Sequence, residues 1–140
     1  MDLDQINRVQ STFAKVSGDP EVTDAFSKAF YEHLFSLDPT VRAMFPDDMT
    51  AQRQKLMDEL TMIVESLGRL GALVARTTDL GRRHAGYGVE PHHYDLVLEA
   101  LVHALVTTLP DAVTDDVALA WRRAYHLVAE TMLYGAAHPD

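Results

Sequence analysis

The chain has 140 residues, no cysteine, seven histidines and a formal net charge of −9. Its length suits a single domain over residues 1–140, and the lack of cysteine excludes disulfides, iron–sulfur clusters and cysteine zinc sites. The acidic charge argues against nucleic-acid partners, because no basic cluster is larger than Arg82–Arg83. The sequence begins without the features of a secretion signal and has no apolar run that could span a bilayer. We therefore expect a cytoplasmic protein with no integral membrane segment.

Two Asp-Pro pairs mark element starts in the first third of the chain, because aspartate caps helices and proline is tolerated at the first helical position. Apolar residues at helical spacing precede Asp19-Pro20 and predict a helix that stops at Gly18. A second helix should follow that pair, and Asp38-Pro39 should open a short segment that ends near Phe45-Pro46. The apolar positions of the two helices are Ile6, Val9, Phe13 and Val16, and then Val22, Phe26, Phe30 and Leu34.

The middle of the chain predicts one clear helix and then a less regular region. Thr50 is a suitable cap for the clear helix. Four glycines punctuate the region from Leu70 to Gly88, which favours one or two short helices there over one long helix. The apolar stripe of the clear helix is Leu56, Leu60, Ile63 and Leu67, widened by Met57 and Val64.

The last third of the chain predicts two more helices. Pro91 can start the first of them and Pro110 ends it, while Thr114 caps a final helix that frays by Gly135 and Pro139. No stretch alternates with a period of two, so we expect no sheet. Six to eight helices of mixed length favour an irregular all-α fold with oblique crossings over a simple four-helix bundle. The predicted core faces are Tyr94, Val97, Leu98, Leu101 and Leu105, and then Val117, Trp121, Tyr125, Val128 and Met132.

Only one histidine lies where a buried ligand is expected. His84 follows Leu80 by one helical turn, so one ring nitrogen can face a metal while the other donates to a carbonyl near Leu80. A hydrogen-bonded core histidine is the more frequent explanation of such a position. No second protein ligand accompanies His84 at metal spacing, so a metal there must bring four ligands of its own, as haem iron does. The other histidines are interpreted as surface or rim residues: His33, His92, His93, His103, His126 and His138.

The stretch Arg83–Tyr94 resembles the proximal-histidine segment of bacterial globins of the flavohaemoglobin lineage, where a basic residue and the haem-binding histidine precede Pro-x-x-Tyr. The resemblance is collinear along nearly the whole chain and is strongest to the single-domain, Vitreoscilla-like type. It implies a globin fold of six to eight helices that enclose one haem. The other matching segments are Phe30–Phe35, Pro39–Arg42 with Phe45, Gln52–Leu56 and Trp121–Tyr125.

The resemblance also implies roles for individual residues around haem b, which is iron protoporphyrin IX. His84 would bind the iron, with Leu80 one turn before it and Tyr94 behind it, and Arg83 or Lys55 would pair with a propionate. On the opposite side, the candidate catalytic residues Tyr31 and Gln52 would donate hydrogen bonds. The residues that would pack on the porphyrin or line this pocket are Phe45 and Leu56.

Each of these assignments has an ordinary alternative. Tyr31 also suits a core tyrosine with a backbone partner, Phe45 a corner residue before Pro46, and Gln52 an exposed residue in the first turns of its helix.

Two departures from the family pattern bear on activity. The family's last-helix glutamate falls at Ala136, and Glu130 is the only acidic residue in that helix body, which weakens the case for peroxidase-like chemistry. No nucleotide-binding loop is present, so any turnover needs an external reductase. We expect binding of dioxygen, nitric oxide and carbon monoxide, with oxidation of nitric oxide to nitrate as the candidate reaction. The alternatives are a gas sensor or carrier without turnover, and a haem-free globin-like interaction domain.

Overall fold

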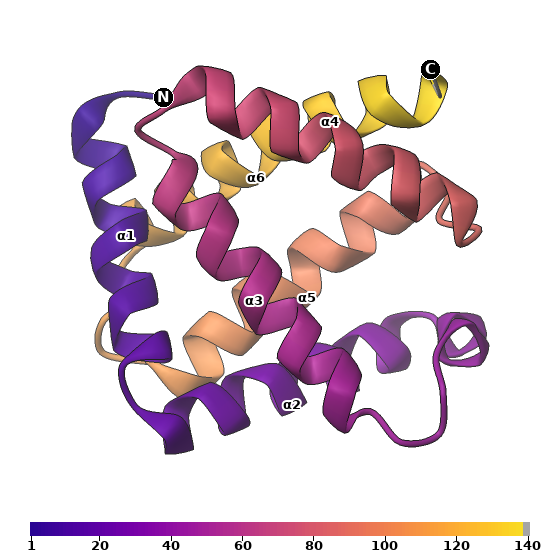
Figure 1. The fold of residues 1–140 in the computed structure, drawn as a ribbon. Coiled ribbons are helices and arrows are strands. Elements are labelled where there is room, and N and C mark those ends of the chain that lie inside the picture. The colour runs from indigo at the N-terminus through magenta and orange to yellow at the C-terminus, as the bar shows by residue number, and fades with distance from the viewer. Residues whose placement is uncertain (139–140) are drawn as a thin grey trace.

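The computed structural model describes residues 1–138, and this part of the chain contains six α-helices, one 3₁₀ helix and no strand. The all-α prediction is therefore confirmed, and the seven elements fall within the expected six to eight (Figure 1). In chain order they are α1 (Leu3–Ser17), α2 (Pro20–Leu37), η1 (Pro39–Met44), α3 (Thr50–Ser66), α4 (Leu70–Gly86), α5 (His93–Thr108) and α6 (Asp115–Ala137).

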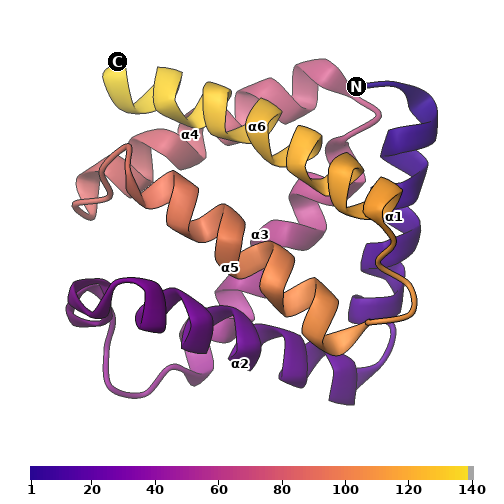
Figure 2. The same cartoon turned by 180° about the vertical axis from the view of Figure 1, so that it is seen from behind.

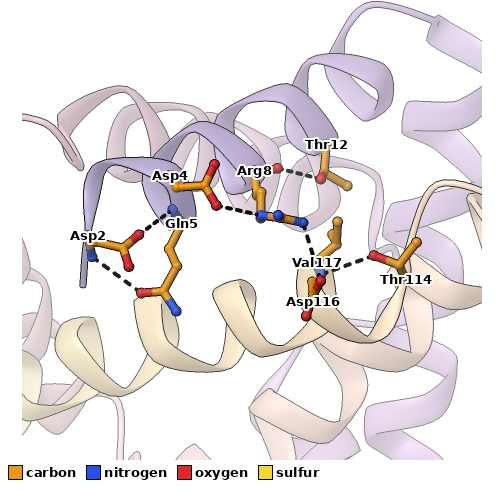
Figure 3. Close-up of polar contacts among 8 residues, drawn as sticks. All are labelled: Asp2, Asp4, Gln5, Arg8, Thr12, Thr114, Asp116 and Val117. Carbon is orange, nitrogen blue, oxygen red and sulfur yellow. Dashed lines mark hydrogen bonds and ion pairs between the residues drawn. The ribbon is translucent and has the colours of Figure 1, made fainter.

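Helix α1 begins with a reciprocal cap and is joined to α6 by an arginine. The Gln5 amide donates to the Asp2 carboxylate at 2.8 Å, while the Asp2 amide donates to the Gln5 side chain at 3.3 Å. Arg8 donates to Asp4 one turn earlier, at 3.1 Å, and approaches Asp116 of α6 at 3.9 Å (Figure 3). The first helix is thereby positioned against the start of the last one.

The predicted caps are confirmed at three positions and wrong at one. The side chains of Asp19, Asp38 and Thr114 each accept a hydrogen bond from a backbone N–H in the first turn of the following element. Thr50 does not cap α3; it is the first residue of that helix, and its N–H donates to the Asp48 carboxylate at 3.0 Å. A carboxylate two residues earlier supplies both the acceptor and a negative charge near the positive helix end.

The segment from Leu70 to Gly86 is one helix of 17 residues, so the prediction of one or two short helices there is wrong. Local glycine content suggested a break, but Leu73, Thr77 and Leu80 bury one face of the continuous helix. Tertiary packing of that face outweighs the propensity penalty of roughly 1 kcal/mol for each internal glycine.

Two helix boundaries also differ from the prediction. Helix α5 begins at His93 and not at Pro91, because residues 90–93 form a turn in which the His93 N–H donates to the Glu90 carbonyl. Helix α6 continues through Ala137 without fraying at Gly135, which is buried. The other predicted fraying position, Pro139, lies outside the described residues.

The helices pack in pairs, with α4 against α6 and α2 against α5 (Figures 1 and 2). The predicted apolar faces of α1, α2, α5 and α6 enter the shared core, which includes Phe13, Phe26, Leu105 and Trp121. Helix α3 differs, because its predicted stripe of Leu56, Leu60 and Ile63 is only half-buried, while Met57, Val64 and Leu67 are buried. In the described residues, no helix has the length and hydropathy needed to cross a membrane.

Candidate functional site

Tyr31 of α2 and Gln52 of α3 form a polar pair inside an apolar setting. The Gln52 side-chain amide donates to the Tyr31 hydroxyl at 3.2 Å, and Tyr31 is only 6% exposed. Since the phenol oxygen accepts this bond, its own proton stays available to a further acceptor, and none lies in hydrogen-bonding range among residues 1–138. Burial raises the pKa of Tyr31, and the Gln52 hydrogen bond opposes that rise in part. The hydroxyl is therefore a neutral donor at physiological pH.

Two phenylalanine rings lie close to the Tyr31 ring. Phe45 lies 5.6 Å from the Tyr31 ring, centroid to centroid, in an edge-to-face arrangement, and Phe35 lies 5.8 Å from it. The segment that carries Phe45 is held by Arg42, whose guanidinium donates to the carbonyls of residues 45, 46 and 47 and lies over the Phe35 ring. One arginine thus fixes both the loop after η1 and the position of its aromatic residue.

His84 lies on the last turn of α4, and its two ring nitrogens have different surroundings. Its Nδ1 is 2.8 Å from the Leu80 carbonyl oxygen, as predicted from the one-turn spacing. A carbonyl can only accept, so Nδ1 carries the proton and donates, which leaves Nε2 with a free lone pair. This tautomer is the one that a metal ligand requires. No carboxylate is bonded to His84 in the described chain, and Glu130 is exposed on α6.

The helix that carries His84 is fixed by an unusually close contact between α4 and α6. A Cβ atom at Gly81 would lie 1.9 Å from the Met132 carbonyl oxygen, and one at Gly135 would lie 1.9 Å from the Thr78 carbonyl oxygen. Only glycine lets two backbones approach so closely. One turn before Gly81, the hydroxyls of Thr77 and Thr131 are hydrogen-bonded, and Thr77 is fully buried.

The remaining predicted site residues occupy different environments. Leu80 is buried, whereas Leu56 and Tyr94 are half-buried. Burial raises the pKa of Tyr94, but no hydrogen bond joins it to His84 within the described chain; its carbonyl instead accepts from Tyr125.

Arg83 is exposed and pairs with two carboxylates. It lies 3.2 Å from Asp79 and 3.7 Å from Glu59 of α3, beside a surface hollow between α3 and α4.

The predicted site residues fall into two contact networks. Tyr31, Gln52 and Phe45 form one network, and His84 and Leu80 form a second. Lys55 is exposed on α3 and has no ion pair in the described part of the chain.

Sequence reasoning missed three features of these networks. The role of Arg42 depends on the path of the loop that it contacts, and the contact at Gly81 depends on a helix more than 30 residues away along the chain. The third feature is a pair of stacked rings, His33 on α2 and His103 on α5, with centroids 3.8 Å apart. Each of these two histidines was correctly predicted to lie near the surface. Their stacking was not predictable, because the periodicity of one helix does not show which residue of another helix it meets.

A family model and several curated proteins match this chain, and their descriptions agree with one another. The family model described as Globin matches residues 28–132. A flavohemoprotein of Halalkalibacterium halodurans is 30% identical over 79% of this chain and 28% of its own length. A flavohemoprotein of Vibrio cholerae is 27% identical over 93% of this chain and 33% of its own length, so the chain spans a third or less of these relatives. An uncharacterized globin-like protein of Aquifex aeolicus is 31% identical over 74% of this chain and 73% of its own.

Two solved structures share the arrangement of helices. A bacterial globin from Campylobacter jejuni has a TM-score of 0.83 at 20% identity and covers 97% of this chain and 96% of that one. A Pseudomonas aeruginosa protein, described as structurally highly homologous to a human hemoglobin, has a TM-score of 0.82 at 24% identity and covers 94% and 98%. At such identities the likeness concerns the fold.

Proposed function

The chain belongs to the globin family and is related to the globin domains of bacterial flavohemoproteins, and from this we propose that it binds haem b through His84 and holds diatomic gases beside Tyr31 and Gln52. Globin membership rests on the match to the family model and on the relatives, and two solved structures support the globin fold. The roles that we propose for individual residues rest on the side-chain contacts described above.

The residues present fit a haem group in their donor chemistry. His84 has Nδ1 engaged with the Leu80 carbonyl and Nε2 free, which is the arrangement of a proximal iron ligand. The apolar residues Phe45, Leu56 and Leu60 are only half-buried, although they contact the core, so a flat apolar ligand would cover surface that they now expose. The observation that carries the proposal is this tautomer at a half-buried histidine, because the exposed His138 makes the same bond at the surface.

Haem would supply the iron at which dioxygen, nitric oxide or carbon monoxide binds. The chain would supply the surroundings. The Tyr31 hydroxyl, which accepts from Gln52, keeps its own proton for a ligand that gains negative charge, and such a donor is strongest where water is excluded. Phe45 and Leu56 would exclude that water. Arg83 would hold a propionate by exchanging its pairing with Asp79 or Glu59.

Gas binding is favoured over autonomous oxidation by the partner of His84. A carbonyl acceptor leaves the imidazole less electron-rich than a carboxylate would, so the ring donates less to a bound metal. Oxidation of nitric oxide to nitrate is the secondary proposal, supported by the Tyr31–Gln52 pair, and repeated turnover needs a source of electrons.

Titration of the purified protein with haemin tests the main proposal. We expect one haem per chain and a Soret band, and His84→Gln should weaken haemin affinity at least tenfold. His138→Gln is the matched control, because this exposed histidine also bonds a carbonyl one turn earlier yet carries no predicted role. A wild-type chain that takes up no haemin, or a His84→Gln variant that binds like the wild type, would overturn the proposal and favour a haem-free interaction domain.

The secondary proposal needs a separate measurement. We expect stopped-flow mixing of the reduced, oxygen-equilibrated protein with nitric oxide to yield nitrate in proportion to protein. An absorption spectrum that stays unchanged after mixing would leave a gas carrier or sensor as the function.

A further inference from the structure

A second group of metal-ligating side chains lies away from His84. Asp38, between α2 and η1, meets His92 and His93, which lie at the start of α5. One ligand atom from each residue lies within 4.8 Å of the other two. Asp38 and His93 are half-buried and His92 is exposed, so the group is open to solvent yet partly fixed by its surroundings.

We propose that Asp38, His92 and His93 bind a divalent transition-metal ion of the Zn²⁺ type. Two imidazoles and one carboxylate form a ligand set that zinc uses with one position left for water. A tetrahedral ion with bonds of about 2.0–2.1 Å holds its ligand atoms about 3.4 Å apart. The three atoms, at no more than 4.8 Å, therefore need to close by roughly 1.4 Å at most, which side-chain rotation can supply.

The carboxylate of Asp38 is prepared for this role by its neighbour Thr40. Both the hydroxyl and the backbone N–H of Thr40 donate to Oδ1, at 2.6 and 3.0 Å, which leaves Oδ2 to the metal. The Thr40 hydroxyl is the main cause that lowers the pKa of Asp38, and the Thr40 backbone N–H lowers it further. The group is thus ionised well below neutral pH.

The Glu90 side chain lies beside the His92 ring. The Glu90 carboxylate lies 3.4 Å from Nδ1 of His92, so it favours the tautomer with a proton on Nδ1 and a free Nε2. A carboxylate behind a ligating imidazole is the usual support for zinc ligands in proteins.

His93 carries the one contact that metal binding must replace. Its Nδ1 accepts from the Glu90 N–H at 2.8 Å, which fixes the proton of the neutral ring on Nε2. A neutral imidazole has a single lone-pair nitrogen, so a metal at either position displaces this bond. The Glu90 amide is therefore a specific reporter of binding.

The other histidine pair is a poorer candidate. His33 and His103 stack almost face to face, with 7° between the ring planes, and they have no carboxylate that completes a three-ligand group in the described chain. Their joint removal provides a control in which histidines are lost from a different pair.

Competition titration of the full chain against a chromophoric zinc chelator tests the proposal. We expect the wild-type chain to bind one Zn²⁺. His92→Gln and Asp38→Asn should each weaken the affinity for Zn²⁺ at least tenfold. Asparagine caps as well as aspartate, so Asp38→Asn keeps the turn and removes the charge. The double control, His33→Gln with His103→Gln, should bind Zn²⁺ like the wild type.

Two results would overturn the proposal: unchanged affinity in His92→Gln, or loss of the site in the double control. Zn²⁺ should also shift the Glu90 amide resonance in an NMR spectrum, whereas Mg²⁺ should not, because it prefers all-oxygen ligands. A Glu90 resonance that stays in place under saturating Zn²⁺ would contradict the assignment of His93. Haemin uptake does not enter either readout, so this test is independent of the proposed function.

Discussion

The two networks of the site are held in different ways. On the His84 side, α4 meets α6 through backbone atoms at Gly81 and Gly135, where a single added carbon has no space. On the Tyr31 side, α2, η1 and α3 meet through side chains: the Gln52 amide on the phenol, and Arg42 on three loop carbonyls. The contact between α4 and α6 is made by backbone atoms and has a single geometry. The contacts on the Tyr31 side are made by side chains, which can rotate about their bonds.

This difference indicates that the α4–α6 side is rigid and that the Tyr31 side is adaptable. A backbone contact transmits displacement directly, because no side chain can change rotamer to absorb it. Side-chain contacts at a loop can adjust, so we expect the Tyr31 side to change conformation more readily than the contact between α4 and α6. We expect mutations on the two sides to differ in what they alter: stability of the whole fold on the α4–α6 side, and ligand kinetics on the other.

Gly81→Ala should have the largest effect. The new Cβ would lie 1.9 Å from the Met132 carbonyl oxygen, so α4 must move away from α6. We expect a loss of about 3 kcal/mol in the free energy of unfolding, measured by urea denaturation.

Gly71→Ala is the matched control on the same helix. Nothing lies within 4 Å of the added Cβ there, so alanine should stabilise by about 0.5–1 kcal/mol through its better helix propensity. Equal destabilisation by the two variants would show that the close contact with α6 is not what fixes α4.

Tyr31→Phe should act on ligand kinetics. The phenol proton and the acceptor for the Gln52 amide are both lost, while the buried ring remains. We expect dioxygen to dissociate about tenfold faster, equivalent to about 1.4 kcal/mol, in flash-photolysis or stopped-flow experiments. An unchanged off-rate would remove Tyr31 from the proposed pocket.

Arg42→Ala should loosen the loop that carries Phe45. Its guanidinium bonds to three loop carbonyls and its contact with Phe35 are lost, for which we expect about 1 kcal/mol of destabilisation. Arg42→Lys should recover only part of it, since one ammonium cannot reproduce the planar fork. Faster amide exchange confined to residues 45–47 would mark the loop; exchange that also rises in α4 would contradict the separation of the two sides.

Alkaline pH should produce the smallest effect. Burial raises the pKa of Tyr31 and, more strongly, that of Tyr125, whose charge would also be opposed by Tyr94 and Asp95. Since each folded pKa lies above the unfolded value of about 10, the contribution of these two tyrosines to stability is constant below about pH 10 and is lost above it, as the unfolded chain loses protons first.

Each of these two tyrosines should contribute less than about 1 kcal/mol of this loss at about pH 10.5. Urea denaturation at rising pH measures the slope, which should be shallower in Tyr125→Phe than in the wild type. A slope that the substitution leaves unchanged would contradict the role of Tyr125.

How far the sequence predicts the molecule depends on how local each feature is. The caps at Asp19 and Asp38 and the bond between His84 and Leu80 lie within a few residues, and all three were predictable. The continuity of α4 was not, because its glycines look like interruptions until the partner helix shows why Gly81 must be small.

The candidate site divides in the same way. The contact between Tyr31 and Gln52 joins residues 21 positions apart. The family resemblance implied that both side chains lie on one side of the haem, but it did not predict their contact. The Asp38, His92 and His93 group joins segments that no local pattern connects. Spacing on one helix predicts which face a residue occupies, but not which residue of another helix faces it.

The contact between α4 and α6 also sets an order of events during synthesis. The hydroxyls of Thr77 and Thr131 are separated by 54 positions, and α6 is translated after α4. Helices α1 to α3 precede α4 and can pack together early, whereas α4 lacks the helix that it packs against until α6 has emerged from the ribosome. We therefore expect α4 to dock after α1 to α3 have packed together.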